Sequence, residues 1–95
     1  MSGQKIPVGL FHLGRIVSTP GALQCLAQID IIMSIQRHQA GDWGDLCEED
    51  RHQNDIALER GGRLVSVYHS SAGLKFYVIT EADRSVTTIL LPEEY

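Results

Sequence analysis

The stretch RLVSVYHSSAGLKFYVITEADRSVTTILL, residues 63–91, decides the fold. It holds three runs of strand length that are rich in β-branched and aromatic residues. These runs are residues 63–69, 74–80 and 85–91. The links between them are short and carry Ser, Gly and Asp, which favour turns, and Pro92 ends the last run. Strands joined by such short links predict an antiparallel three-stranded meander.

Upstream of the meander, residues 20–38 form one predicted helix. Thr19 can cap it with its hydroxyl, and Pro20 suits the first helical position, where no backbone N–H is needed. Apolar residues recur at spacings of three and four and make two adjacent stripes. They are Ala22, Leu23, Cys25, Leu26, Ala27, Ile29, Ile31, Ile32, Met33 and Ile35. Because the stripes cover most of the cylinder, we expect this helix to be central and largely buried.

A second helix is predicted over residues 45–60. Asp45, followed by Glu48 three residues later, has the pattern of a capping box, and two glycines after the helix would stop it. Its inner stripe places Asp50 and Asn54 (or, in its place, Gln53) among apolar neighbours. Buried polar groups need hydrogen-bond partners, so these two side chains predict either a structural network or a functional pair.

Together these elements predict an α+β fold in which two helices pack on one face of a three-stranded antiparallel meander. A short N-terminal strand over residues 11–17 could join the sheet, although Gly14 weakens it. We expect one domain over residues 11–95, preceded by a flexible arm over residues 1–10. The first helix has more apolar surface than one small sheet covers, which leaves a homodimer open.

Composition and charge narrow the range of partners that the protein could bind. The chain has 95 residues, of which 43% are hydrophobic, so one ordered domain is expected. Its net charge of −4 argues against bulk nucleic acid or anionic lipid as the partner. Residues 41–59 hold seven acids and one base, a net charge of −6, whereas residues 1–40 carry +2 and residues 60–95 carry zero. The acidic segment is either a solvated surface or a patch for a basic partner.

Two isolated cysteines, Cys25 and Cys47, fit a reducing cytoplasm. The N-terminus has no apolar run of signal-peptide length, and no segment reaches the roughly 18 apolar residues of a membrane span. Nucleophile elbows, phosphate-binding glycine loops and other cofactor motifs do not occur in the sequence. The sequence therefore predicts a cytoplasmic protein with no cofactor and no catalytic residue, and an enzyme is the less favoured class.

The sharpest local feature is Asp-Trp-Gly-Asp at residues 42–45, which contains the only tryptophan. In one interpretation Trp43 plugs the joint between the helices while the two acids bond backbone amides. In a second, Trp43 is an exposed hot spot for a protein partner. The third is a magnesium or manganese site. Its ligands would be His38, Asp42 and Asp45, with His52 as a fourth.

Several segments of the chain together resemble a known family. They are LGRIVSTPGAL at 13–23, RH at 37–38, GDWGDL at 41–46, ED at 49–50, Asn54, AL at 57–58, RL at 63–64, SVY at 66–68 and ITEADRSVTTILLP at 79–92. The chain is similar here to small "plasmid-related" proteins of plasmids and integrated mobile elements, over most of its length from residue 13. The resemblance implies a cytoplasmic accessory protein of a mobile element or phage, and it assigns no catalytic residue.

From the acidic segment and this resemblance we expect a non-catalytic binding protein, concretely an inhibitor of a host defence system such as CRISPR or restriction machinery. It would occupy a basic groove that normally takes nucleic acid. Arg84, in a charged turn, is either solvated or a fork for an anion. The predicted partner-binding residues are Asp42, Trp43, Asp45, Glu48, Glu49 and Arg84.

Two other classes stay open. RelE-like ribonuclease toxins also place helices before an antiparallel sheet, and they line that sheet with basic and tyrosine residues, whereas this chain is acidic overall. The residues available for that role are Arg63, Tyr68, Lys75, Arg84 and Tyr95. The remaining alternative is a metal-binding or small-molecule-binding regulator built on the His38, Asp42 and Asp45 set.

Overall fold

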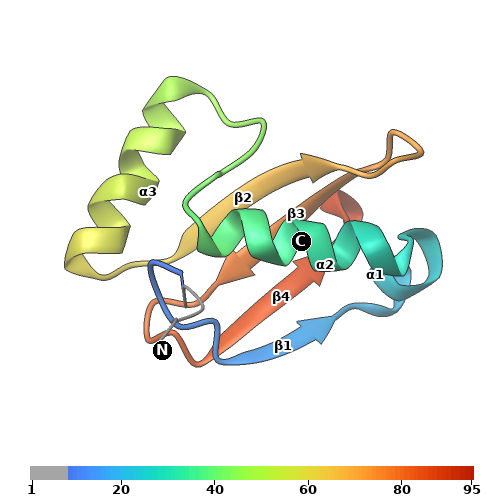
Figure 1. The fold of residues 1–95 in the computed structure, drawn as a ribbon, viewed down its shortest axis with the longest axis horizontal. Helices are drawn as coiled ribbons and strands as arrows, with labels where there is room; N and C mark the ends of the chain where they lie inside the picture. Colours follow the sequence, from blue (N-terminus) through green and yellow to red (C-terminus); the bar gives the residue numbers. More distant parts are fainter. Residues whose placement is uncertain (1–8) are drawn as a thin grey trace, which may run out of the picture.

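The computed structural model describes residues 9–95 and has a four-stranded sheet with helices on one face (Figure 1). In chain order the elements are β1 (Arg15–Ser18), α1 (Pro20–Cys25), α2 (Gln28–Gln39), α3 (Glu48–Arg60), β2 (Leu64–His69), β3 (Lys75–Thr80), β4 (Val86–Leu90) and the 3₁₀ turn η1 (Pro92–Glu94). The three predicted strands of the meander are confirmed, each to within one residue at either end. The predicted arm over residues 1–10 lies, except for its last two residues, outside the described part of the chain.

The sheet is mixed, not purely antiparallel, and its order is β1-β4-β3-β2. The meander pairs β2 with β3 and β3 with β4 antiparallel, as predicted. The N-terminal strand also forms, but it pairs parallel with β4, with Arg15 opposite Val86 and Ser18 opposite Ile89. The helices carry the chain from β1 at one edge of the sheet to β2 at the other. Alternation of residues within one segment predicts a strand, but it does not identify the distant strand with which that segment pairs.

The predicted helix over residues 20–38 is two helices, and the prediction of one continuous helix is wrong. Thr19 caps α1 as expected, since its Oγ1 accepts a hydrogen bond from the Ala22 N–H at 3.3 Å. The chain leaves the helical conformation at Leu26, which has φ −105° and ψ 137°. Leu26 is thereby buried in the core, and α2 starts afresh after Ala27. One straight helix could turn only one face to the sheet, so the break allows residues from both predicted stripes to reach the core.

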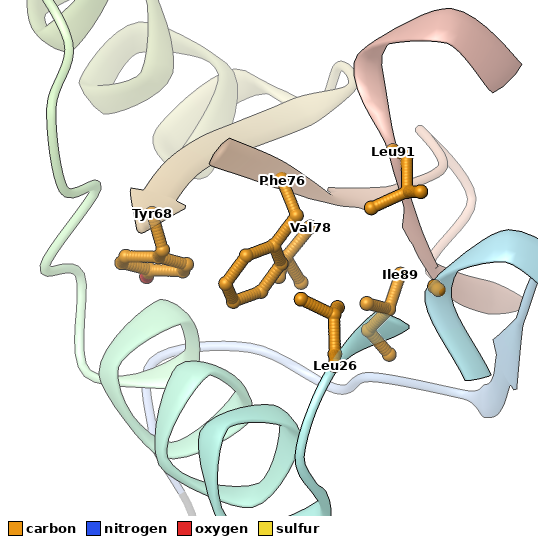
Figure 2. Packing of buried hydrophobic residues seen from close by; sticks show 7 residues of the cluster. Leu26, Tyr68, Phe76, Val78, Ile89 and Leu91 are labelled. Atoms are coloured by element: carbon orange, nitrogen blue, oxygen red, sulfur yellow. The ribbon is translucent and has the colours of Figure 1, made fainter. Parts of the chain in front are cut away.

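Strand register decides which side chains face α1 and α2. Ser66 pairs with Val78 and Val78 with Ile89, and because side chains alternate along a strand these three residues share the face that the helices cover. The core lies there, between the sheet and the two helices, with Ile31 and Ile35 of α2 packed against it. Its fully buried members are Ala22, Leu26, Tyr68, Phe76, Val78, Ile89 and Leu91 (Figure 2).

The second face of the sheet carries the alternate residues. Val65 and Ile79 pair across β2 and β3 on this face, and the Tyr77 ring meets the Tyr95 ring edge-on, with centroids 5.7 Å apart. Helices α1 and α2 both lie on the opposite face (Figure 1).

Helix α3 stands beside the β2 edge and does not lie over the sheet (Figure 1). It begins at Glu48 with Cys47 as its N-cap, and no side chain makes the capping hydrogen bond. The predicted Asp45 cap and the predicted burial of Asp50 are therefore wrong, whereas the predicted burial of Asn54 is confirmed. Among residues 9–95, no helix combines the length and the apolar character that crossing a membrane requires.

Candidate functional site

The Trp43 side chain lies inside the protein, with 3% of its surface exposed. Its ring stacks on Phe11 at 6.2 Å between centroids and meets His38 edge-on at 5.7 Å. The indole Nε1–H donates to Asp55 Oδ1 of α3 at 3.2 Å. The expectation of an exposed indole that anchors a partner is therefore wrong, and Trp43 instead joins α3 to the helix α2 side of the core.

Asp42 is also used within the fold, although about half of its side chain is exposed. Arg37 Nε donates to its carboxylate at 2.8 Å, and the Gly44 N–H donates at 3.2 Å. The hydrogen bond from Arg37 holds the pKa of the Asp42 carboxyl below its usual range. The Arg37 guanidinium lies 4.5 Å above the Tyr68 ring, and the Tyr68 hydroxyl donates to the Asp42 carbonyl. Since its charge is paired with that of Arg37, Asp42 adds little to the field that a partner would meet.

Residues 43–45 seal the outer edge of β2. The Val67 N–H donates to the Trp43 carbonyl at 3.1 Å, and the Asp45 N–H donates to the Val67 carbonyl at 2.7 Å. Two residues earlier in β2, the Asn54 side-chain amide bonds the Val65 backbone twice. Its Nδ2 donates to the Val65 carbonyl at 2.7 Å, and its Oδ1 accepts from the Val65 N–H at 3.1 Å. An uncapped edge strand is a template for pairing with another chain, so these contacts protect β2.

A chain of buried polar side chains crosses the core from β2 to the N-terminal segment. The Thr87 hydroxyl donates to the Leu13 carbonyl at 2.7 Å. A hydroxyl has one proton, so in the 2.7 Å contact between Thr80 and Thr87 it is Thr80 that donates. Thr80 Oγ1 then accepts from His38 Nε2–H at 2.9 Å. The other nitrogen of the neutral ring, Nδ1, accepts from the Ser66 hydroxyl at 2.5 Å.

His38 is consequently a structural residue held in one tautomer. The ring is fully buried, and burial, reinforced by the positive charge of Arg84, lowers its pKa to about 4. Both ring nitrogens have protein partners, so His38 has no lone pair free for a metal. The proposed magnesium or manganese site on His38, Asp42 and Asp45 is therefore ruled out. Within residues 9–95, no three His, Cys, Asp or Glu residues are grouped so that they could hold a metal ion.

The Arg84 guanidinium is directed into the fold and not toward a ligand. Its Nη1 donates to the Gly62 and Glu81 carbonyls, and its Nη2 donates to the Ala57 carbonyl at 3.0 Å. The residue has a φ of 61°, the left-handed conformation, which turns its side chain across the 81–84 turn. Arg84 thus joins the end of α3 to the β3–β4 turn, and the donors that the predicted anion fork would need are already in use.

Of the five residues available to a ribonuclease, Tyr68 is buried and Arg84 is bonded to backbone carbonyls. Arg63, Lys75 and Tyr95 remain exposed. The Arg63 Nη1 donates to the Tyr95 hydroxyl at 3.1 Å, and its Nη2 lies 3.4 Å from Glu81. Since Arg63 already has a carboxylate partner, this part of the sheet offers little uncompensated positive charge to RNA.

A cleft of about 530 Å³ lies between α3 and the β2 end of the second face of the sheet. Its apolar lining consists of Leu46, Ile56, Ala57 and Val65, and its polar lining includes Asp50, Gln53 and Arg63. A second cleft, of about 200 Å³, begins on the other side of Arg63 and runs to Thr88, Leu90 and Tyr95. The structure thus brings Asp50, from the acidic first turn of α3, to the wall of an apolar cleft, which the sequence did not predict.

The other predicted partner-binding residues are exposed, and none of them is among the residues that line this cleft. Glu48 and Glu49 start α3, and Asp45 precedes it with 75% of its side chain exposed. Only Asn54 of α3 is buried, so nearly the whole helix circumference faces solvent, and the carboxylates of Glu48, Glu49 and Asp50 are exposed. Asp50, which sequence reasoning placed in the core, belongs with these exposed acids.

Comparison with protein-family models gave no match, and comparisons with curated proteins and with solved structures gave none either. The resemblance to plasmid-related proteins and the fold analogy to RelE-like toxins both remain predictions from the sequence.

Proposed function

We propose that this protein is a non-catalytic binding protein that holds a basic segment of a partner protein in the cleft beside α3. The observation that carries the proposal is an apolar cleft of about 530 Å³ whose lining includes Asp50 of α3. An apolar cleft with a few polar groups on its rim is a usual form of ligand-binding site. Here Asp50 lies in the lining, Glu49 precedes it in α3, and the lining's one cation, Arg63, is paired with Glu81, so the site favours a cationic ligand.

The two parts of the site have separate tasks. Ile56 and Val65 offer surface for one or two apolar side chains of the partner, and burial of that surface supplies affinity. The carboxylates of α3 attract Lys and Arg of the partner, speed association and select against acidic surfaces. Trp43 acts indirectly, because its hydrogen bond to Asp55 holds α3 at the distance from the sheet that keeps the cleft open.

A groove that binds nucleic acid is lined by clustered Lys and Arg, and a carboxylate beside the cleft complements such a surface. Together with the resemblance to plasmid-related proteins, this supports the narrower proposal of an inhibitor that blocks such a groove in a CRISPR or restriction protein of the host.

The experiment is a pull-down from lysate of the native host at two salt concentrations. The test variant is Glu49→Lys/Asp50→Lys, and the matched control is Asp83→Lys/Glu93→Lys, which changes the net charge equally at two residues outside the cleft lining. Specific partners should be lost with the test variant and with added salt, and kept by the control. If both double variants retain the same partners, the proposed site is wrong.

A further inference from the structure

Helices α1 and α2 present four apolar side chains to solvent, which we call the α1–α2 ridge: Leu23, Ile29, Ile32 and Met33. Their exposed fractions are 64%, 60%, 44% and 50%. Ser34 and His38 mark the buried side of α2, and at 100° per residue Ile29 and Met33 point away from it. Helices α1 and α2 follow each other along the same side of the sheet (Figure 1).

We propose that a second copy of this chain docks on the α1–α2 ridge and forms a two-fold dimer. Large apolar residues that are half exposed on two consecutive helices on the same side of the sheet mark an interaction site, since soluble monomers rarely leave large apolar patches open. In a two-fold dimer the same patch meets itself, so the patch must be complementary to itself. An apolar strip meets this requirement directly.

The charges around the ridge favour a second copy over other occupants. Residues 16–29 contain no charged residue, and the carboxylate of Asp30 is bonded to the Ser71 N–H and hydroxyl. The ridge is bordered by exposed Gln24, Gln28 and Gln36, and by Arg37, whose charge is paired with Asp42 at 2.8 Å. An amide both donates and accepts hydrogen bonds, so glutamines can pair with their own copies across a two-fold axis.

Other occupants fit this surface less well. Nucleic acid needs clustered Lys and Arg, and so does an amphipathic helix that lies on an anionic membrane. A basic protein is attracted to α3, which lies at the opposite end of the molecule from α1 (Figure 1). That separation also keeps the acidic segments of two copies apart. The dimer would carry two α3 clefts, one on each copy.

Sedimentation equilibrium and light scattering on the full chain test the proposal. The wild type should show a monomer–dimer equilibrium in the micromolar range. Met33→Glu should raise the dimer dissociation constant by at least about tenfold, because it places a charge in an apolar interface. The matched control is Leu74→Glu, an exposed leucine in the β2–β3 turn that should leave the constant unchanged.

Each alternative outcome is decisive once circular dichroism shows that the variants are folded. A wild type that stays monomeric up to millimolar concentration would overturn the proposal. A dimer that Met33→Glu and Ile29→Glu leave intact would show that the copies meet elsewhere, and would overturn it too. The result is independent of the α3 cleft, because neither substitution touches that site.

Discussion

His38 Nε2 of α2 donates its proton to Thr80 Oγ1 of β3 across 2.9 Å, and no other assignment of protons satisfies the rest of the chain. The terminal acceptor is the Leu13 carbonyl, which cannot donate, so every hydroxyl upstream must donate toward it. The N-terminal segment, the sheet and α2 are therefore joined by one directional network inside the core. Such networks specify one arrangement of the elements when every member is satisfied.

The first prediction concerns acid stability. The His38 pKa is about 4 in the folded protein, below its ordinary value of 6.5, so between these values the unfolded chain binds the extra proton and the folded protein does not. Stability is therefore full above pH 6.5 and falls as the pH drops to 4, by about 3 kcal/mol in all. Urea unfolding across this range measures the loss. His38→Gln should be less stable at neutral pH and should lack this slope, and an equal slope in the variant would refute the assignment.

A second prediction uses a matched pair of threonines. Thr80→Val removes the acceptor of the His38 proton and the donor to Thr87, and should cost about 1–3 kcal/mol, because buried polar groups lose their partners. Thr88→Val changes a half-buried threonine on the second face of the sheet and should stay within about 0.5 kcal/mol. Denaturant midpoints compare the two variants, and equal losses would contradict the network.

Trp43 gives a third, spectroscopic prediction. As the only tryptophan, and with 3% of its surface exposed, it should emit at short wavelength and resist quenching by acrylamide or iodide in the native state. Unfolding in urea should shift the emission to the red. Native emission that is already red-shifted and readily quenched would show that the indole is exposed, and would support Trp43 as a hot spot for a partner.

Sequence reasoning succeeded where the signal is local. The three meander strands alternate or carry β-branched runs between turn residues, and Thr19-Pro20 marks a helix start, so both could be located to within about one residue. Asn54 was identifiable as a buried amide, because it interrupts an apolar stripe. Its bonds to the Val65 backbone were not, since they depend on where β2 ends up relative to α3.

What failed depends on tertiary context. The parallel pairing of β1 with β4 joins segments about 70 residues apart. The helix breaks at Leu26 because burial of that side chain in the core stabilises the fold more than one further helical turn would. The exposed Trp43 was inferred from its acidic neighbours, but Phe11 and His38 cover it from other parts of the chain. A signal for the buried network was present: Ser66, Thr80 and Thr87 are polar residues at inward positions of otherwise apolar strands.

A fourth prediction tests how closely the turn fits the β2 edge. Gly44 and Gly73 both have positive φ, of 78° and 85°, so alanine at either site carries the left-handed cost of roughly 1–2 kcal/mol. A Cβ at Gly44 would lie 2.0 Å from the Val67 carbonyl oxygen, whereas one at Gly73 would meet nothing within 4 Å. Gly44→Ala should therefore cost at least about 2 kcal/mol more than Gly73→Ala. Thermal and urea unfolding decide, and equal costs would show that the turn is not held against Val67.

The last prediction follows from the two bonds between Asn54 and Val65. Asn54→Ala removes both, leaves the Val65 N–H and carbonyl at an open edge, and should cost about 2 kcal/mol. Asn54→Asp keeps the size but turns a carboxylate oxygen toward the Val65 carbonyl, so it should cost at least as much. The exposed neighbour Gln53→Ala should change stability by less than about 0.5 kcal/mol.

The same substitutions should change how the protein associates. An edge strand with free backbone groups pairs with other chains. Asn54→Ala should therefore aggregate faster than Gln53→Ala when the two variants are compared at conditions that leave the same fraction of each protein folded. Light scattering at matched fractional stability separates this edge effect from simple unfolding. If the two variants aggregate at the same rate under those conditions, Asn54 acts only as a tether for α3, and the β2 edge is protected by residues 43–45 alone.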